Sequence, residues 1–139
     1  MSENGTFSRN FHEFYDNKGP TLSIIKSKNN NIFGGFTPLN WNSNNIRFKD
    51  ETNSTFLFSL NLMKKLDIIN IKKYAIFCYS NNGPYFGASD LRLDQNMKKG
   101  QTFANTSCSY LSNNNLITGG HGDNEFFEVE DLEVFEVKY

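Results

Sequence analysis

The sequence has few of the residues that build reactive or metal-binding sites. Its 139 residues include two cysteines, Cys78 and Cys108, and two histidines, His12 and His121. It contains no Cys-x-x-Cys, His-Glu-x-x-His or Gly-x-Ser-x-Gly pattern and no phosphate-binding glycine loop. The four candidate ligands have no recognisable zinc spacing. We therefore expect no metal, no cofactor and no enzymatic activity.

Long apolar runs are also lacking. No run reaches 18 residues, and the segment Met1 to Asn10 has no apolar signal-peptide core. We expect no transmembrane segment, a cytoplasmic location and free thiols. Cys78 lies in an apolar segment and fits an inert core thiol better than a redox sensor, which needs an exposed thiolate near positive charge. Cys108 lies in a more open, serine-flanked segment.

A surplus of positive charge is missing as well. The net charge is -1, and the lysine pairs at 64/65, 72/73 and 98/99 are scattered, which argues against a nucleic-acid partner. Acidic residues gather near the C-terminus instead, at Asp123, Glu125, Glu128, Glu130, Asp131, Glu133 and Glu136. A protein partner with a basic surface is therefore expected.

Phenylalanine and asparagine are abundant. Fourteen Phe supply material for a core, and 21 Asn favour turns. We expect one domain over residues 1–139, in the α+β class but mostly β: an antiparallel β-sandwich flanked by short helices. The predicted core contains Phe56, Phe58, Ile76, Phe86, Phe126 and Val134.

The N-terminal third predicts a helix and a hairpin. Phe7, Phe11 and Phe14 are spaced for one helix face, and Gly19-Pro20 ends the helix. Strands 21–25 and 32–36 should pair around an Asn-rich turn at 28–31. Gly34 and Gly35 inside the second strand imply close approach of a ring, for which Trp41 is the candidate, and they suit packing better than a ligand groove.

The remaining segments alternate between strands and turns. Residues 40–53 read as a loop, and further strands are expected at 55–60, 73–79, 91–93 and 105–111. The stretch 125–139 alternates acidic and apolar residues over two strands broken near Asp131. Glu133 in this stretch is either solvent-facing or buried with a partner.

Two functional alternatives remain open. His121, in the loop Gly119 to Glu125, could act as a general acid/base with Cys108 or Ser109 as nucleophile, giving a weak hydrolase. A polar surface loop is the favoured interpretation of this segment, because nothing places a nucleophile within reach. Alternatively, a sandwich face bearing Trp41, Tyr85 and Tyr110 could bind a small molecule or glycan.

Four segments, in order, resemble the TLDc domain of oxidation-resistance proteins. They are an Asp-x-x-Gly-Pro-Thr-Leu run before a Phe-Gly-Gly strand, the strand Phe-Leu-Phe-Ser-Leu, a Gly-Pro-x-Phe-Gly segment before Asp-Leu, and the closing Glu-Val-Phe-x-Val strand. The residues carrying this resemblance are Asp16, Gly19, Pro20, Gly34, Gly35, Trp41, Phe58, Gly83, Pro84, Phe86, Gly87, Asp90 and Glu133. Family members usually have a further strand before the first helix, and we expect the domain to lack it or to be part of a longer protein.

The resemblance implies a non-catalytic, protein-binding β-sandwich. For the family it implies protection against oxidative stress and, in several members, regulation of the vacuolar proton-pumping ATPase. We expect a monomer that contacts its partner through Gly119, Gly120, His121, Asp123, Glu125, Glu128 and Glu130.

Overall fold

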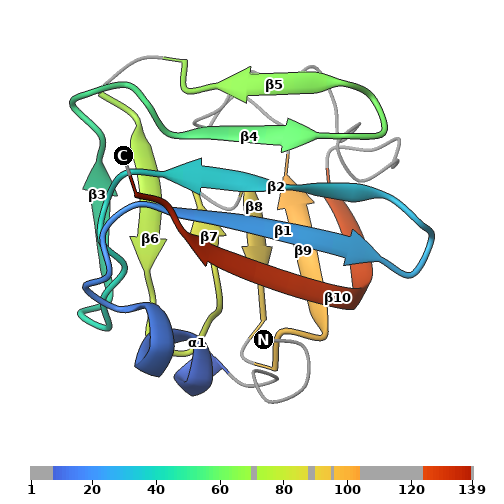
Figure 1. Ribbon diagram of the computed structural model, residues 1–139, viewed down its shortest axis with the longest axis horizontal. Helices are drawn as coiled ribbons and strands as arrows, with labels where there is room; N and C mark the ends of the chain where they lie inside the picture. The colour runs from blue at the N-terminus through green and yellow to red at the C-terminus, as the bar shows by residue number, and fades with distance from the viewer. Residues whose placement is uncertain (1–7, 70–71, 88–89, 95, 104–123, 139) are drawn as a thin grey trace.

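A computed structural model describes residues 8–69, 72–87, 90–94, 96–103 and 124–138 (Figure 1). Within these ranges the chain forms one helix and ten strands. Their bounds are α1 Ser8–Tyr15, β1 Thr21–Ser27, β2 Ile32–Thr37, β3 Ile46–Lys49, β4 Phe56–Ser59, β5 Lys64–Asp67, β6 Tyr74–Cys78, β7 Tyr85–Phe86, β8 Leu91–Leu93, β9 Lys99–Phe103 and β10 Asn124–Glu136. The part of the chain that is described has no helix long and apolar enough to cross a membrane.

The strands are hydrogen-bonded in one antiparallel order, β3-β6-β7-β8-β9-β10-β1-β2-β4-β5. Figure 1 shows that the first half of this order runs across the second half, with β10 joining the two. The mostly β, antiparallel class is therefore confirmed. The division into a two-sheet sandwich with several flanking helices stays a prediction.

Strand β10 belongs to both halves. Residues 124–128 pair with β9, and Val129 to Glu136 pair with β1. The register shifts between Val129 and Asp131, so Glu130 is an extra residue of the kind found in a β-bulge. The expectation of two strands is wrong, because one 13-residue strand passes through this irregularity.

The predicted hairpin of β1 and β2 is confirmed. The two strands pair from Thr21 opposite Thr37 to Lys26 opposite Ile32. Asn30 in the connecting turn has a φ of 67°, which asparagine tolerates better than most residues. The loop expected at residues 40–53 instead contains β3, and the strand expected at 105–111 lies outside the described residues.

The core lies between the two halves of the sheet. Phe33 of β2 meets Phe127 of β10 edge to face, with ring centroids 5.0 Å apart. Of the predicted core, Ile76, Phe86 and Val134 are buried, and Phe56 and Phe58 are only half-buried. The prediction that Phe126 belongs to the core is wrong, because its side chain is 70% exposed. Strand alternation turns the neighbouring Phe127 inward instead.

Helix α1 buries a different face from the one its Phe spacing predicts. Phe11 is fully buried, whereas Phe14 is 49% exposed, and Phe7 lies outside the described residues. His12 is buried and Tyr15 packs partly against the core. The buried stripe therefore follows positions 11, 12 and 15 rather than 7, 11 and 14.

The paired glycines of β2 allow close packing, as predicted, but the ring involved is not Trp41. A Cβ on Gly35 would lie 2.6 Å from the Phe86 ring, and one on Gly34 would collide with the Ser23 carbonyl oxygen. Trp41 packs edge to face against the same Phe86 ring, with the ring centroids 5.5 Å apart. Gly35 thus lets the two halves of the sheet approach through Phe86.

Candidate functional site

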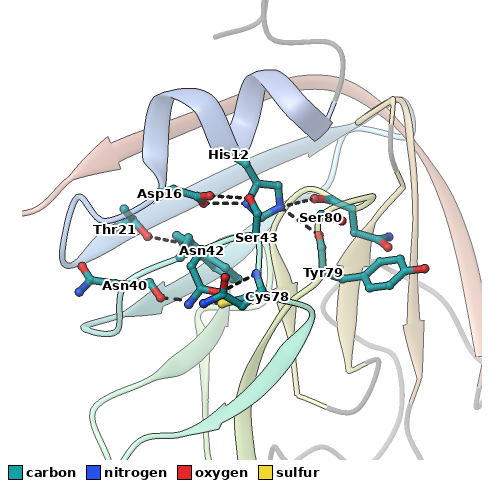
Figure 2. A network of polar contacts seen from close by, with 12 residues as sticks. His12, Asp16, Thr21, Asn40, Asn42, Ser43, Cys78, Tyr79 and Ser80 are labelled. Atoms are coloured by element: carbon teal, nitrogen blue, oxygen red, sulfur yellow. Dashed lines mark hydrogen bonds and ion pairs between the residues drawn. The ribbon is translucent and has the colours of Figure 1, made fainter.

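Three segments far apart in the sequence meet beside α1 (Figure 2). They are the C-terminal turn of the helix, the loop around residues 40–45, and the connection that follows β6. Asp16 and Trp41 form an isolated parallel bridge, and the Asn17 amide donates to the Trp41 carbonyl at 2.8 Å. This junction joins several motif residues in one polar network, and we treat it as the candidate site.

His12 links the helix to the connection after β6. Its Nδ1 lies 2.7 Å from Asp16 Oδ1, and its Nε2 lies 2.9 Å from the Tyr79 carbonyl and 3.0 Å from the Asn82 carbonyl. Each ring nitrogen therefore faces only oxygen atoms of the protein. The His12 side chain is buried, so both nitrogens are engaged inside the fold rather than at an open surface.

Asp16 is shared between His12 and the 40–45 loop. Its Oδ2 accepts a hydrogen bond from Ser43 Oγ at 2.6 Å, while its Oδ1 contacts the imidazole. A nucleophilic serine needs a base at its own hydroxyl, and here the hydroxyl faces the carboxylate rather than the imidazole. The arrangement has the three residue types of a catalytic triad but not its geometry.

Cys78 lies beneath this network and is fully buried. Its Sγ lies 3.8 Å from the Asn40 carbonyl. Burial raises the pKa of the Cys78 thiol to about 11; a backbone hydrogen bond from Asn42 opposes this rise, and the charge of Asp16 adds to it. The thiol therefore stays protonated at neutral pH. Its burial confirms the expectation of a core thiol.

Further hydrogen bonds hold the motif residues of the network in place. Trp41 Nε1 donates to Thr21 Oγ1 at 2.9 Å, and the Gly19 amide donates to Asn40 Oδ1 at 2.6 Å. Asp16, Gly19 and Trp41, all singled out in the sequence, are thus brought together. His12 was not among them, although its position four residues before Asp16 on a helix could have suggested the pair.

The Gly-Pro-x-Phe-Gly motif shapes the other side of the junction. Gly87 has a φ of 67°, and a Cβ there would collide with the buried Asp90 carboxylate. A Cβ on Gly83 would lie 2.9 Å from Met97. The Leu93 amide donates to the Pro84 carbonyl at 3.0 Å. Gly83 and Pro84 end the β6–β7 connection, whose Tyr79 and Asn82 carbonyls contact His12, and Gly87 and Asp90 lie in the following β7–β8 connection.

Only some of the predicted partner-binding residues lie in the part of the chain that the structure describes. Gly119, Gly120, His121 and Asp123 lie outside the described residues, as do Cys108 and Ser109, and Glu125 is described only as part of the β10 backbone. Glu128 and Glu130 are exposed as predicted. Each forms an ion pair with a lysine near the end of β1, Glu128 with Lys28 and Glu130 with Lys26, both at 3.2 Å.

Glu133 lies on β10 opposite Ile24, and its side chain is exposed. Of the two predicted alternatives, it is therefore solvent-facing rather than buried with a partner. No ion pair involves it among the described residues. The alternative of an aromatic face that binds a small molecule or glycan is not supported at two of its three residues, because Trp41 is fully buried and Tyr85 is 7% exposed. Tyr110 lies outside the described residues.

A small pocket of about 190 Å³ lies on the other half of the sheet. It is lined by Arg92, Asp94, Lys99, Gly100, Gln101 and Phe126. The described residues contain no group of three potential metal ligands. Neither the pocket nor the His12 network combines a free base with a nucleophile.

Together these features define a mostly β domain whose motif residues pack and hydrogen-bond within the fold. The chain matches the family model of the TLDc domain over residues 1–138. It therefore belongs to the TLDc domain family, as its sequence motifs led us to expect. A search of curated proteins finds no significant match.

Proposed function

We propose that this TLDc domain is a non-catalytic module that binds a protein partner in the cytoplasm. Family resemblance supports subunits of the vacuolar proton-pumping ATPase as the partner, and protection against oxidative stress as the setting. The observation that carries the proposal is the row of exposed carboxylates on β10, at Glu128, Glu130 and Glu133, in a domain whose family is known.

The local geometry supports binding over catalysis. Both nitrogens of His12 are engaged by oxygens, and burial holds the pKa of the Cys78 thiol at about 11. Exposed carboxylates, by contrast, attract a basic surface over a distance and speed its association. The ion pairs of Glu128 and Glu130 lie at the surface and contribute little stability, so a partner's basic groups can compete with the lysines.

The test measures capture of purified peripheral subunits of the proton pump by the immobilised domain, at low and at physiological salt. The double variant Glu128→Lys with Glu130→Lys should bind about tenfold more weakly, and the salt dependence of binding should flatten. Circular dichroism checks that the fold is retained.

The matched control is Glu13→Lys with Glu51→Lys. It makes the same change in net charge at two exposed carboxylates away from β10, and its binding should stay near the wild-type level. Equal capture of both double variants and the wild type at every salt concentration would remove β10 as the contact surface. Absence of capture by the wild type would remove this partner.

A further inference from the structure

One surface of the sheet has the reverse of the usual pattern. Along β1, the residues turned toward the core are Thr21, Ser23, Ile25 and Ser27, whereas Leu22 and Ile24 point outward and are half-buried. Antiparallel sheets with one solvated face usually place polar residues outside. We call the outward side chains of this half of the sheet the outer face; its apolar members are Leu22, Ile24, Ile32, Phe36, Phe56, Phe58 and Phe135.

The strand register arranges the outer face in two rows. The first row runs through Phe135, Leu22, Phe36 and Phe56, and the second through Glu133, Ile24, Gly34, Phe58 and Lys65. The Phe36 and Phe56 rings stack at 5.5 Å, and Lys65 Nζ lies 4.7 Å from the centre of the Phe56 ring. In Figure 1, β1, β2 and β4 lie on the viewer's side, with no other labelled helix or strand in front of them.

We propose that a second copy of this chain docks on the outer face, forming a dimer about a two-fold axis that runs along β2. Such an axis exchanges β1 with β4 and β10 with β5, because these pairs are equally far from β2 in the strand order. The second row of one copy then lies against the second row of the other copy. Glu133 faces Lys65 of the partner subunit, Ile24 faces Phe58 of the partner subunit, and Gly34 faces its own equivalent.

Charge complementarity favours a second copy over an unrelated partner. In the second row, the face has the Glu133 carboxylate on its β10 side and the Lys65 ammonium group on its β5 side, and Asp67 ends the first row beside Lys65. A two-fold interface brings each side against the other, which is the self-complementarity that isologous dimers require. A partner with charges of one sign would be attracted at one side of the face and repelled at the other. Lys65 already contacts Asp67 at 3.3 Å, and Glu133 of the partner subunit would add a second carboxylate.

The size of the face sets the strength expected of the dimer. The five strands lie about 4.8 Å apart and pair over roughly four to eight residues each, so the face spans at most about 20 by 20 Å. Stable interfaces bury about 1,200 to 2,000 Å² in total, whereas two such faces together offer about 800 Å², the size of a weak contact. We therefore expect a dissociation constant of about micromolar order. This inference replaces the monomer that the sequence led us to expect.

Sedimentation equilibrium from about 1 to about 500 μM tests the proposal. The wild type should form a dimer as its concentration rises. Glu133→Lys and Lys65→Glu should each weaken dimerisation about tenfold or more, because each variant sets like charges face to face. The double variant Glu133→Lys with Lys65→Glu should restore it, since the two sides exchange charge. Glu13→Lys is the matched control and should dimerise like the wild type.

Thermal unfolding shows whether each variant keeps its fold, and recovery in the double variant cannot arise from misfolding. A wild type that stays monomeric at the highest concentration would overturn the proposal. So would a dimer that both single variants leave unchanged. If the double variant dimerises no more strongly than the single variants, Glu133 does not face Lys65 of the partner subunit. That result would overturn the proposed axis.

Discussion

Cys78 shows how burial alone decides the chemistry of a single residue. Its thiol touches a loop carbonyl and lies in the core, so its pKa is raised to about 11. At neutral pH only about one thiol in ten thousand is then ionised. A redox-sensing cysteine needs the opposite environment, an exposed thiolate near positive charge. Oxidation protection by this domain would not depend on Cys78.

Alkylation measures this directly. In a Cys108→Ser variant, Cys78 is the single thiol. At pH 8, iodoacetamide should label the native protein at least about 100-fold more slowly than the protein unfolded in guanidinium. The native rate should rise as the pH is raised toward 11, because the thiolate fraction grows. Similar rates in the native and unfolded protein would contradict the assignment.

Single residues also mark where sequence reasoning failed. Alternation predicted two strands over residues 125–139, but Phe126 and Phe127 are adjacent and both apolar, so the pattern could not tell which one points inward. The glycine pair predicted a nearby ring, yet Phe86 and Trp41 were both eligible. Choosing between them required the approach of two halves of the sheet that local patterns do not encode.

Among the elements, the turn that enters β4 depends on Asp50. Its Oδ1 accepts from the Thr52 amide at 2.9 Å, and its Oδ2 accepts from the Ser54 amide at 3.0 Å and the Thr55 amide at 2.8 Å. Burial acts to raise the pKa of this carboxyl. Hydrogen bonds from Thr52, Thr55 and Ser54 outweigh that effect, so the pKa lies below its ordinary value of 3.8.

This lowered pKa predicts an acid-sensitive contribution to stability. A carboxylate with a lower pKa in the folded state stabilises the fold above its unfolded pKa, and this stability is lost as the pH falls through the folded value. Asp50→Asn should therefore cost about 1 to 3 kcal/mol near pH 7. In urea unfolding, the difference from the wild type should shrink as the pH falls below about 4.

The neighbouring Glu51→Gln is the control, because Glu51 is exposed and its replacement should change the free energy of unfolding near pH 7 by less than about 0.5 kcal/mol. A penalty for Asp50→Asn that is the same at pH 7 and in acid would show that the turn depends on shape rather than on the charge of Asp50.

Elements with clear apolar strand patterns were predictable, and short or edge elements were not. The β1–β2 hairpin followed from apolar strands around an Asn turn. Interior strands β7 and β9 were missed, as were β3 and β5, which are the two ends of the strand order. Three of the four residues in each of β3 and β5 are exposed, and both strands carry lysine or arginine, as edge strands often do. Such strands lack the alternation that identifies a half-buried strand.

In the whole molecule, the contact between Gly35 and Phe86 joins the two halves of the sheet. Gly35 lies on β2 and Phe86 on β7, strands well separated in the strand order. The space for a side chain at Gly35 is already filled by the ring. The separation of the two halves is therefore set in part by the absence of one Cβ atom.

Gly35→Ala should lower the free energy of unfolding by about 1 to 3 kcal/mol, because the added methyl group overpacks the contact. Phe86→Leu removes the outer ring atoms, so Gly35→Ala should cost clearly less in that background. Denaturant unfolding of the two single variants and the double variant measures this coupling. Additive effects would show that the ring moves aside without cost.

The central position of β10 ties folding to the order of synthesis. This strand is translated after all the others described, yet both β9 and β1 pair with it. Until residues 124–136 have left the ribosome, each half of the sheet has an open edge, and unpaired strand edges promote aggregation. Neither half can be completed cotranslationally before the other. The nascent chain is thus most in need of chaperone protection just before β10 emerges.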